Sequence, residues 1–575
     1  MRRKEDSALK TDVVWKWAGF TIAFAAAVEL IFWKCRFGLG DEDEAFYLTI
    51  PYRLCLGDAL FSEEWNLSQM TGFLLYPFVR IYLAINQSMD GIILTSRYLY
   101  ATIQCGVGLL IFCCLKKINW MGAAVASICF VLYAPFSIMA LSYNSMGIMA
   151  MTGCLVLLTV AEKYIYIYIL CGMSLACAVL CVPFSFLLWL LYAAAVFCCF
   201  LRARKGYLET VSPTLSTKAF WLLTLGAAAV ALAFLGFALS RASIFEIIRS
   251  IPALFMAPDH TYSSKKLFEF FYAILLLDGK NTLLLYLLLG LVFLFCLFDR
   301  RRSERKAFYF WLCFSLTAAL MGIHFLKGYI NFLMWPMNTV APIIWLISDN
   351  RHIKKIFWNI WVPGILFSFC HYMGSNQRFY AISSAATVAL IGSILLLAIY
   401  ASDVLGSSEK KWKRGAAVTA VIFLFVFQVS AQAFLRYKHI YWDSDVETQV
   451  CEIENGPDAG LFVSPAKYGI YQKSMNAVSV LEGYAPEKVL FLSRQTWMYL
   501  CGDYEFAGYS AWLSGVNDYT IERLGLYYSL NPHKTPDVVF VEHENQAYAD
   551  SFCDKFGYIA YPYDECLILV RDSAP

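Results

Sequence analysis

Apolar segments long enough to cross a lipid bilayer recur along this chain, from Val13 almost to Leu435. A spanning helix needs about 20 consecutive, mostly apolar residues, and the sequence offers about 13 such segments. Only 15% of the residues are charged, whereas a soluble domain has roughly 25%. The sequence therefore predicts a polytopic α-helical membrane protein. Its net charge of +3 is too small and too dispersed to favour nucleic-acid binding.

Basic residues gather in alternate connections between the apolar segments. Because cytoplasmic connections are enriched in Lys and Arg, the N-terminus and stretches such as DRRRSERK from Asp299 are predicted to be cytoplasmic. The acidic stretch after the first segment and everything after Arg436 are then outside the cell membrane. The first apolar segment, Val14 to Trp33, exceeds the apolar core of a signal peptide, which is about 7 to 15 residues. We expect it to remain as the first span.

The composition changes near Tyr437, where short β-rich runs such as KVLFLS begin to alternate with polar and helical stretches. This alternation predicts a small α/β domain outside the membrane, over residues 437–575. The preceding residues, 1–436, form the predicted transmembrane domain, which includes an acidic outer loop over residues 36–91.

Four consecutive carboxylates, at residues 41–44, follow the first span within a few residues, and a second acidic pair lies at residues 63 and 64. Carboxylates on the outer face suit the deprotonation of a hydroxyl or the binding of a divalent cation. Acidic residues also stabilise the first turn of a helix, and AFYLTIPYRL directly after them can begin an amphipathic helix on the membrane surface. The residues alone leave both interpretations open.

The stretch from Asp41 to Tyr100, which begins DEDEAFYLTIPYRL, resembles the first outer loop and second span of bacterial GT-C glycosyltransferases. The protein O-mannosyltransferases and the aminoarabinose transferases are of this kind. The resemblance implies a hexosyl or pentosyl transferase that uses a polyprenyl-phosphate sugar as its lipid-linked donor. The acceptor would be a hydroxyl of an envelope glycan, lipid or protein on the outer face of the membrane, and the reaction would invert the anomeric carbon.

The Asp-Glu motif of this family matches Asp43 and Glu44 best, because the aromatic run AFYL follows directly; Asp41 is the alternative. The resemblance makes Asp43 the general base, since a hydroxyl is a poor nucleophile until a carboxylate accepts its proton. Glu44 and Glu64 would orient the substrate or bind a metal ion. Gln69 would hydrogen-bond the sugar or order the loop.

A departing lipid phosphate needs cations or a metal ion near the outer surface. We favour Arg97, because it lies at the outer end of the second span, where the family has an arginine; its alternative role is to extend toward the lipid headgroups. The other candidate cations are Arg53, Lys265, Lys266, Lys327 and Arg378.

Asp259 and His260 follow Pro258 in another outer stretch, where they would bind a phosphate or metal ion or form a polar turn. The use of a divalent metal ion is left open, with Asp43, Glu64, Asp259 and His260 as its candidate ligands.

The alternative function is a multispan transporter or a flippase for envelope precursors. Transporters have their substrate sites near the bilayer midplane, often with embedded charges. Charges inside the spans are sparse in this chain, and the clearest, Glu29, lies near the outer end of its span. This distribution favours chemistry at the outer surface.

Overall fold

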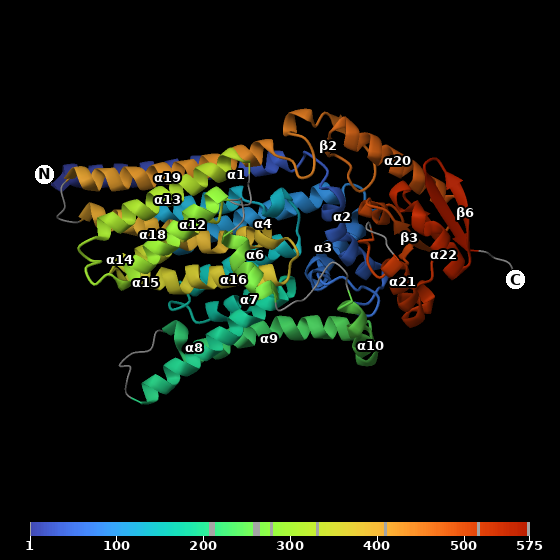
Figure 1. Ribbon diagram of the computed structural model, residues 1–575, viewed down its shortest axis with the longest axis horizontal. Coiled ribbons are helices and arrows are strands. Elements are labelled where there is room, and N and C mark those ends of the chain that lie inside the picture. Colours follow the sequence, from blue (N-terminus) through green and yellow to red (C-terminus); the bar gives the residue numbers. More distant parts are fainter. Residues whose placement is uncertain are drawn as a thin grey trace.

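The computed structural model describes residues 2–205, 213–256, 265–275, 280–328, 333–406, 411–513 and 518–571. A helical bundle occupies one end of the molecule and an α/β domain occupies the other (Figure 1). The predicted fold class, a polytopic helical protein with a C-terminal α/β domain, is confirmed.

The helices of the bundle and its loops run from the N-terminus to Lys438. They are α1 (Arg2–Lys34), α2 (Asp41–Leu56), α3 (Met70–Asn86), α4 (Ile92–Leu115), α5 (Trp120–Leu132), α6 (Tyr143–Leu158), α7 (Ile167–Cys181), α8 (Phe186–Arg204), α9 (Thr217–Leu239), α10 (Ile244–Leu254), α11 (Lys265–Leu275), α12 (Lys280–Phe298), α13 (Lys306–Leu326), α14 (Val340–Ile347), α15 (Arg351–Ile356), α16 (Val362–Met373), α17 (Arg378–Ala385), α18 (Thr387–Gly406) and α19 (Lys411–Lys438).

Within the described residues, 8 helical segments are long and apolar enough to cross a membrane. They are Val14–Lys34, Ile92–Leu115, Pro183–Arg204, Thr217–Leu239, Lys306–Leu326, Arg351–Met373, Thr387–Val404 and Gly415–Lys438. Other apolar segments that the sequence analysis counted as spans form shorter helices, such as α5, α6 and α7. The segment Thr387–Val404 in α18 is the most buried of the long ones, so it forms the centre of the bundle.

The predicted acidic loop contains α2, which begins at the four carboxylates and ends at Gly57 with a left-handed φ of 115°. The residues from Glu44 to Leu54 are all buried, because α2 lies between the bundle and the C-terminal domain (Figure 1). The prediction of an amphipathic helix on the membrane surface is therefore wrong. Nearly every face of this helix is apolar, which suits burial on all sides.

The C-terminal domain is built on a five-stranded sheet in the order β4-β3-β5-β7-β6. Its strands are β3 (Lys488–Leu492), β4 (Glu505–Phe506), β5 (Val538–Val541), β6 (Tyr558–Tyr563) and β7 (Cys566–Arg571). Strand β3 pairs in parallel with β4 and β5, and the remaining pairs are antiparallel. Three helices complete the domain around the sheet: α20 (Pro465–Glu482), α21 (Asp518–Leu530) and α22 (Ala549–Phe556). The central strands are continuous apolar runs, as expected for strands that are buried on both faces.

A second, two-stranded sheet, β1 (Cys451–Glu452) and β2 (Phe462–Val463), connects this domain to the acidic loop. Gly38 donates its backbone N–H to Phe462 at 2.7 Å, at the beginning of the loop. At its end, Gly91 donates to the backbone oxygen of Gly456 at 3.0 Å. The C-terminal domain therefore holds both ends of the loop that carries the acidic run.

Candidate active site

The two carboxylates of the predicted Asp-Glu motif have different surroundings. Glu44 is buried, whereas Asp43 is partly exposed in the first turn of α2. Arg97 of α4 donates from Nε to Glu44 Oε1 at 2.6 Å and from Nη2 to Oε2 at 2.5 Å. The backbone N–H of Gly40 also donates to Oε2, at 3.1 Å. This bidentate pair fixes the beginning of α2, and with it the position of Asp43.

Arg97 has further acceptors in the chain segment that leads to α2. Its Nη1 donates to the backbone oxygens of Cys35 at 2.9 Å and Phe37 at 3.1 Å, and its Nη2 also donates to Gly38 O at 2.8 Å. A guanidinium has five N–H groups, so these acceptors and Glu44 occupy all of them. These contacts favour a role for Arg97 in positioning the acidic loop, and its predicted contact with the donor phosphate stays a prediction.

Arg53 is likewise part of an internal network. It is fully buried, with Nε 2.6 Å from Asp58 Oδ2 and Nη1 2.8 Å from Glu64 Oε2. Lys534 of the C-terminal domain donates to Asp58 Oδ1 at 2.6 Å. Burial raises the pKa of Glu64, and the charge of Arg53 opposes that shift. Arg53 and Glu64 therefore belong to a network that joins the loop to the C-terminal domain, and the predicted contact of either side chain with substrate stays a prediction.

Gln69 orders the loop, which is one of the two roles that the sequence left open. Its Oε1 accepts the backbone N–H of Phe61 at 2.6 Å. Phe61 has a left-handed φ of 67°, which is unfavourable for a bulky side chain. The buried amide of Gln69 therefore stabilises a strained turn.

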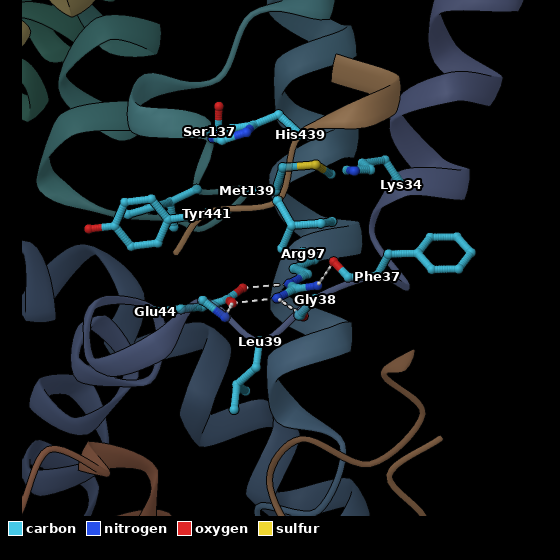
Figure 2. Close-up of a pocket in the computed structure, with 13 residues that line it drawn as sticks. Lys34, Phe37, Gly38, Leu39, Glu44, Arg97, Ser137, Met139, His439 and Tyr441 are labelled. Atoms are coloured by element: carbon cyan, nitrogen blue, oxygen red, sulfur yellow. Dashed lines mark hydrogen bonds and ion pairs between the residues drawn. The ribbon is translucent and has the colours of Figure 1, made fainter. Parts of the chain in front are cut away.

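Asp43 adjoins a narrow pocket of about 20 Å³, with Tyr441 between the carboxylate and the pocket. Tyr441, in the connection after α19, lines this pocket, and its hydroxyl donates to Asp43 Oδ2. Glu44 and Arg97 form part of its wall, together with Lys34 from the end of α1 and His439 from the segment after α19 (Figure 2). The pocket thus lies where the end of α1 and the segments that follow α1 and α19 meet residues 137–139.

Two buried cations, Lys34 in the pocket wall and Arg436 near it, form no ion pair with a carboxylate among the described residues, although the charges of Asp445 and Glu447 act on Lys34. Lys34 is 3% exposed and donates to the backbone oxygen of Tyr437 at 3.0 Å. Arg436 is 3% exposed and donates from Nε to Leu132 O at 3.1 Å. Arg436 lies close enough to Lys34 for their charges to interact. Because an unpaired buried charge is costly, the positive field at this pocket suits an anion from outside the chain.

His439 lies at the rim of the same pocket. Desolvation lowers its pKa, and the charges of Arg436 and Lys34 lower it further. A neutral imidazole can donate one hydrogen bond to an anion without adding charge.

The sequence analysis missed Lys34 and Arg436, although a signal was present. Both lie at ends of spans that the charge pattern predicts to be outer, where the positive-inside rule does not expect cations. The two residues are 402 positions apart, and α1 and α19 lie side by side in the bundle (Figure 1).

The other candidate cations do not line this pocket. Lys265, Lys327 and Arg378 are exposed, and Lys266 donates to the backbone oxygen of Met373 at 3.1 Å. The side chain of Asp41 lies outside the described residues, so its role as the alternative base stays a prediction.

The proposed metal ligands do not assemble in the described part of the chain. Asp259 and His260 lie outside it. The two carboxylate oxygens of Glu64 already accept hydrogen bonds from Arg53 and from the backbone of Asn66, at 2.8 Å each. No group of three His, Cys, Asp or Glu side chains suitable for a metal ion occurs among the described residues. The use of a divalent metal ion therefore stays a prediction.

No protein-family model matches this sequence, and no curated protein matches it. Among solved structures, the chain is similar to an oligosaccharyltransferase from Archaeoglobus fulgidus, with 12% identity, a TM-score of 0.46, and coverage of 95% of this chain and 73% of that one. It is also similar to ArnT from Cupriavidus metallidurans bound to undecaprenyl phosphate, with 10% identity, a TM-score of 0.45 and coverage of 98% of both chains.

Proposed function

We propose that the protein is a membrane glycosyltransferase that moves a sugar from a polyprenyl-phosphate donor to an acceptor hydroxyl on the outer face of the membrane. The supporting observation is that Asp43, through Tyr441, adjoins a pocket lined by Lys34, and that Lys34 and the nearby Arg436 are buried cations without an ion pair among the described residues. Transfer from a lipid phosphate requires this combination. A proton must leave the nucleophile while negative charge collects on the departing phosphate.

Asp43 is the general base of the proposed reaction. It accepts the proton of the acceptor hydroxyl as the acceptor oxygen forms a bond to the anomeric carbon. The bond from that carbon to the phosphate oxygen breaks on the opposite face, so the configuration inverts. The electron pair of the broken bond stays on the phosphate, where Lys34 and Arg436 stabilise the charge.

The paired residues hold this arrangement in place. Arg97 and Glu44 fix the first turn of α2, and Tyr441 brings the segment after α19 against Asp43. Because the C-terminal domain also holds both ends of the loop, we propose that this domain closes the site and takes part in acceptor recognition.

The test is a transfer assay with purified protein in detergent, radiolabelled polyprenyl-phosphate sugars and an envelope extract as the acceptor source. Asp43→Asn keeps the size of the side chain and removes the base, so we expect transfer to fall by at least about 100-fold. Asp90→Asn is the matched control, because Asp90 is an exposed carboxylate of the same loop; it should retain wild-type activity.

Asp41→Asn distinguishes the two candidate bases. If only this variant were inactive, the reaction class would stand and the base would be Asp41. Full activity in both Asp43→Asn and Asp41→Asn would contradict the proposed mechanism.

A further inference from the structure

A second group of polar side chains adjoins Asp43. Tyr47 lies one helical turn after Asp43 in α2, and its ring centroid is 6.0 Å from that of Tyr143, at the beginning of α6. Tyr143 in turn lies 6.4 Å from the imidazole of His371 in α16, with their planes inclined by 22°. Asn144 faces the hydroxyls of both tyrosines. Three helices thus bring phenol, amide and imidazole groups together next to the proposed base.

Two members of this group are buried without the hydrogen bonds that they need. His371 is 1% exposed and Asn144 is 4% exposed. One ring nitrogen of His371 faces the backbone of Ala381, but neither ring nitrogen, nor the amide oxygen of Asn144, makes a hydrogen bond of normal geometry within the residues that the structure describes. An unsatisfied buried polar atom costs about 1–3 kcal/mol. Native proteins retain few such atoms, so each one requires an explanation.

Helix capping does not explain Asn144. The N-cap of α6 is Ser142, whose side chain accepts from the backbone of Ser145, and Ser145 donates back in a capping box. The first turn of α6 is therefore satisfied by two serines, and the amide of Asn144 serves no cap. Its oxygen and the nitrogens of His371 remain available to a bound molecule.

The chemistry of this group selects for a neutral ligand with hydroxyls. An amide and a neutral imidazole can each donate and accept hydrogen bonds, and the tyrosine rings offer apolar faces. The carboxylate of Asp43 disfavours a phosphate group next to Asn144 and His371. The donor phosphate would instead lie near the cations Lys34 and Arg436. A sugar ring has the matching combination of hydroxyl groups and an apolar face.

We propose that Asn144 and His371 hydrogen-bond a neutral, hydroxylated sugar ring held next to Asp43. This inference rests on the proposed function and deepens it. The ring is either the transferred sugar of the donor or a sugar of an acceptor glycan, and the experiment distinguishes these two sources. Both residues act in substrate specificity, and neither takes part in proton transfer.

The variants are Asn144→Leu and His371→Phe, which keep approximate shape and remove the polar atoms. His371→Phe removes no hydrogen bond of normal geometry, so the thermal stability of the free protein should stay the same or rise. Asn144→Leu also removes the contact of the amide with the hydroxyls of Tyr47 and Tyr143, so it should lower thermal stability slightly. Ser142→Ala is the contrasting control. It removes a satisfied cap two residues from Asn144, so it should lower thermal stability and leave sugar recognition unchanged.

Recognition is measured as equilibrium binding without turnover, so the result does not depend on Asp43. The probes are bare undecaprenyl phosphate, the same lipid bearing different hexoses and pentoses, and soluble envelope glycan fragments. If the transferred sugar occupies the site, both variants lose about 10-fold in affinity for a sugar-bearing lipid and bind the bare lipid as wild type does. If an acceptor sugar occupies it, both lose about 10-fold for a glycan fragment instead.

Two results would overturn the inference. One is a wild-type protein that binds every sugar-bearing lipid no more tightly than the bare lipid and binds no glycan fragment. The other is wild-type recognition in both variants, whatever their thermal stability. Failure of the proposed function would differ from both results, because it would appear as transfer that does not depend on either Asp43 or Asp41.

Discussion

Two pairs of buried cations lie at the acidic loop and the neighbouring pocket, and they differ in what surrounds them. Arg53 and Arg97 form ion pairs with carboxylates of the loop. Lys34 and Arg436 donate to backbone oxygens and form no ion pair with a carboxylate among the described residues. Buried charges persist where a partner compensates for their lost hydration. The paired cations therefore hold the loop in place, and in the proposed function the other two cations receive an anionic ligand.

The largest effect should follow from breaking a pair. Arg97→Met leaves the Glu44 carboxylate buried without its cation, which costs about 3–5 kcal/mol. We expect a marked fall in the thermal stability of the detergent-solubilised protein. The double variant Arg97→Met with Glu44→Gln should recover part of the loss, because no uncompensated charge remains. A single variant as stable as wild type would show that the pair does not organise the loop.

Asp458 is a buried carboxyl group near the Arg97–Glu44 pair, and a pH titration of protein stability tests its protonation. Burial and, to a smaller extent, the charge of Glu44 raise the pKa of Asp458 from 3.8 to about 8, while the charge of Arg97 opposes this shift. The folded state therefore holds a proton that the unfolded state has lost between these two pH values, so stability should fall as pH rises through that window. The slope for one such group is at most about 1.4 kcal/mol per pH unit.

Asp458→Asn should reduce this slope, and the difference from wild type should level off above pH 8. The measurement is thermal unfolding of both proteins across the pH range. An unchanged slope in the variant would mean that Asp458 titrates alike in the folded and unfolded states.

The smallest effect on stability should follow from removing an unpaired cation. Lys34→Met replaces a buried ammonium with an apolar chain of similar length, so the free protein should be as stable as wild type or slightly more stable. Thermal unfolding without lipid, alongside Arg97→Met, measures the contrast directly. A loss as large as that of Arg97→Met would show that Lys34 has a structural partner of equal importance.

The sequence predicted the parts of the site that depend on neighbours in the chain. The acidic run does begin a helix, and the apolar runs after Tyr437 do contain strands. The pairing of Arg97 with Glu44 depends on contact between residues 53 positions apart, and the end of a span gives no sign of it. From the sequence, Arg97 is therefore interpreted as a cation available to the donor phosphate. Lys34 is interpreted only as the residue that follows the first apolar segment.

The Asp43 environment shows the same limit. Tyr441 reaches it from 398 positions along the chain, and no local pattern predicts such a contact. The same holds for His371 and Asn144, whose missing hydrogen bonds become visible only when α6 and α16 are packed. Residue types are read directly from the sequence. Only the packing of distant segments shows which polar atoms lack a hydrogen-bond partner among the described residues.

The most direct test of this account is equilibrium binding of undecaprenyl phosphate compared with undecaprenol, the same lipid without the phosphate. Wild type should bind the phosphate form at least about 10-fold more tightly, because hydrogen bonds to charged groups contribute about 1.5–3 kcal/mol. The double variant Lys34→Met with Arg436→Gln should lose this preference while its binding of undecaprenol stays unchanged. A preference that survives in the double variant would contradict the claim that these two cations receive the phosphate of the donor.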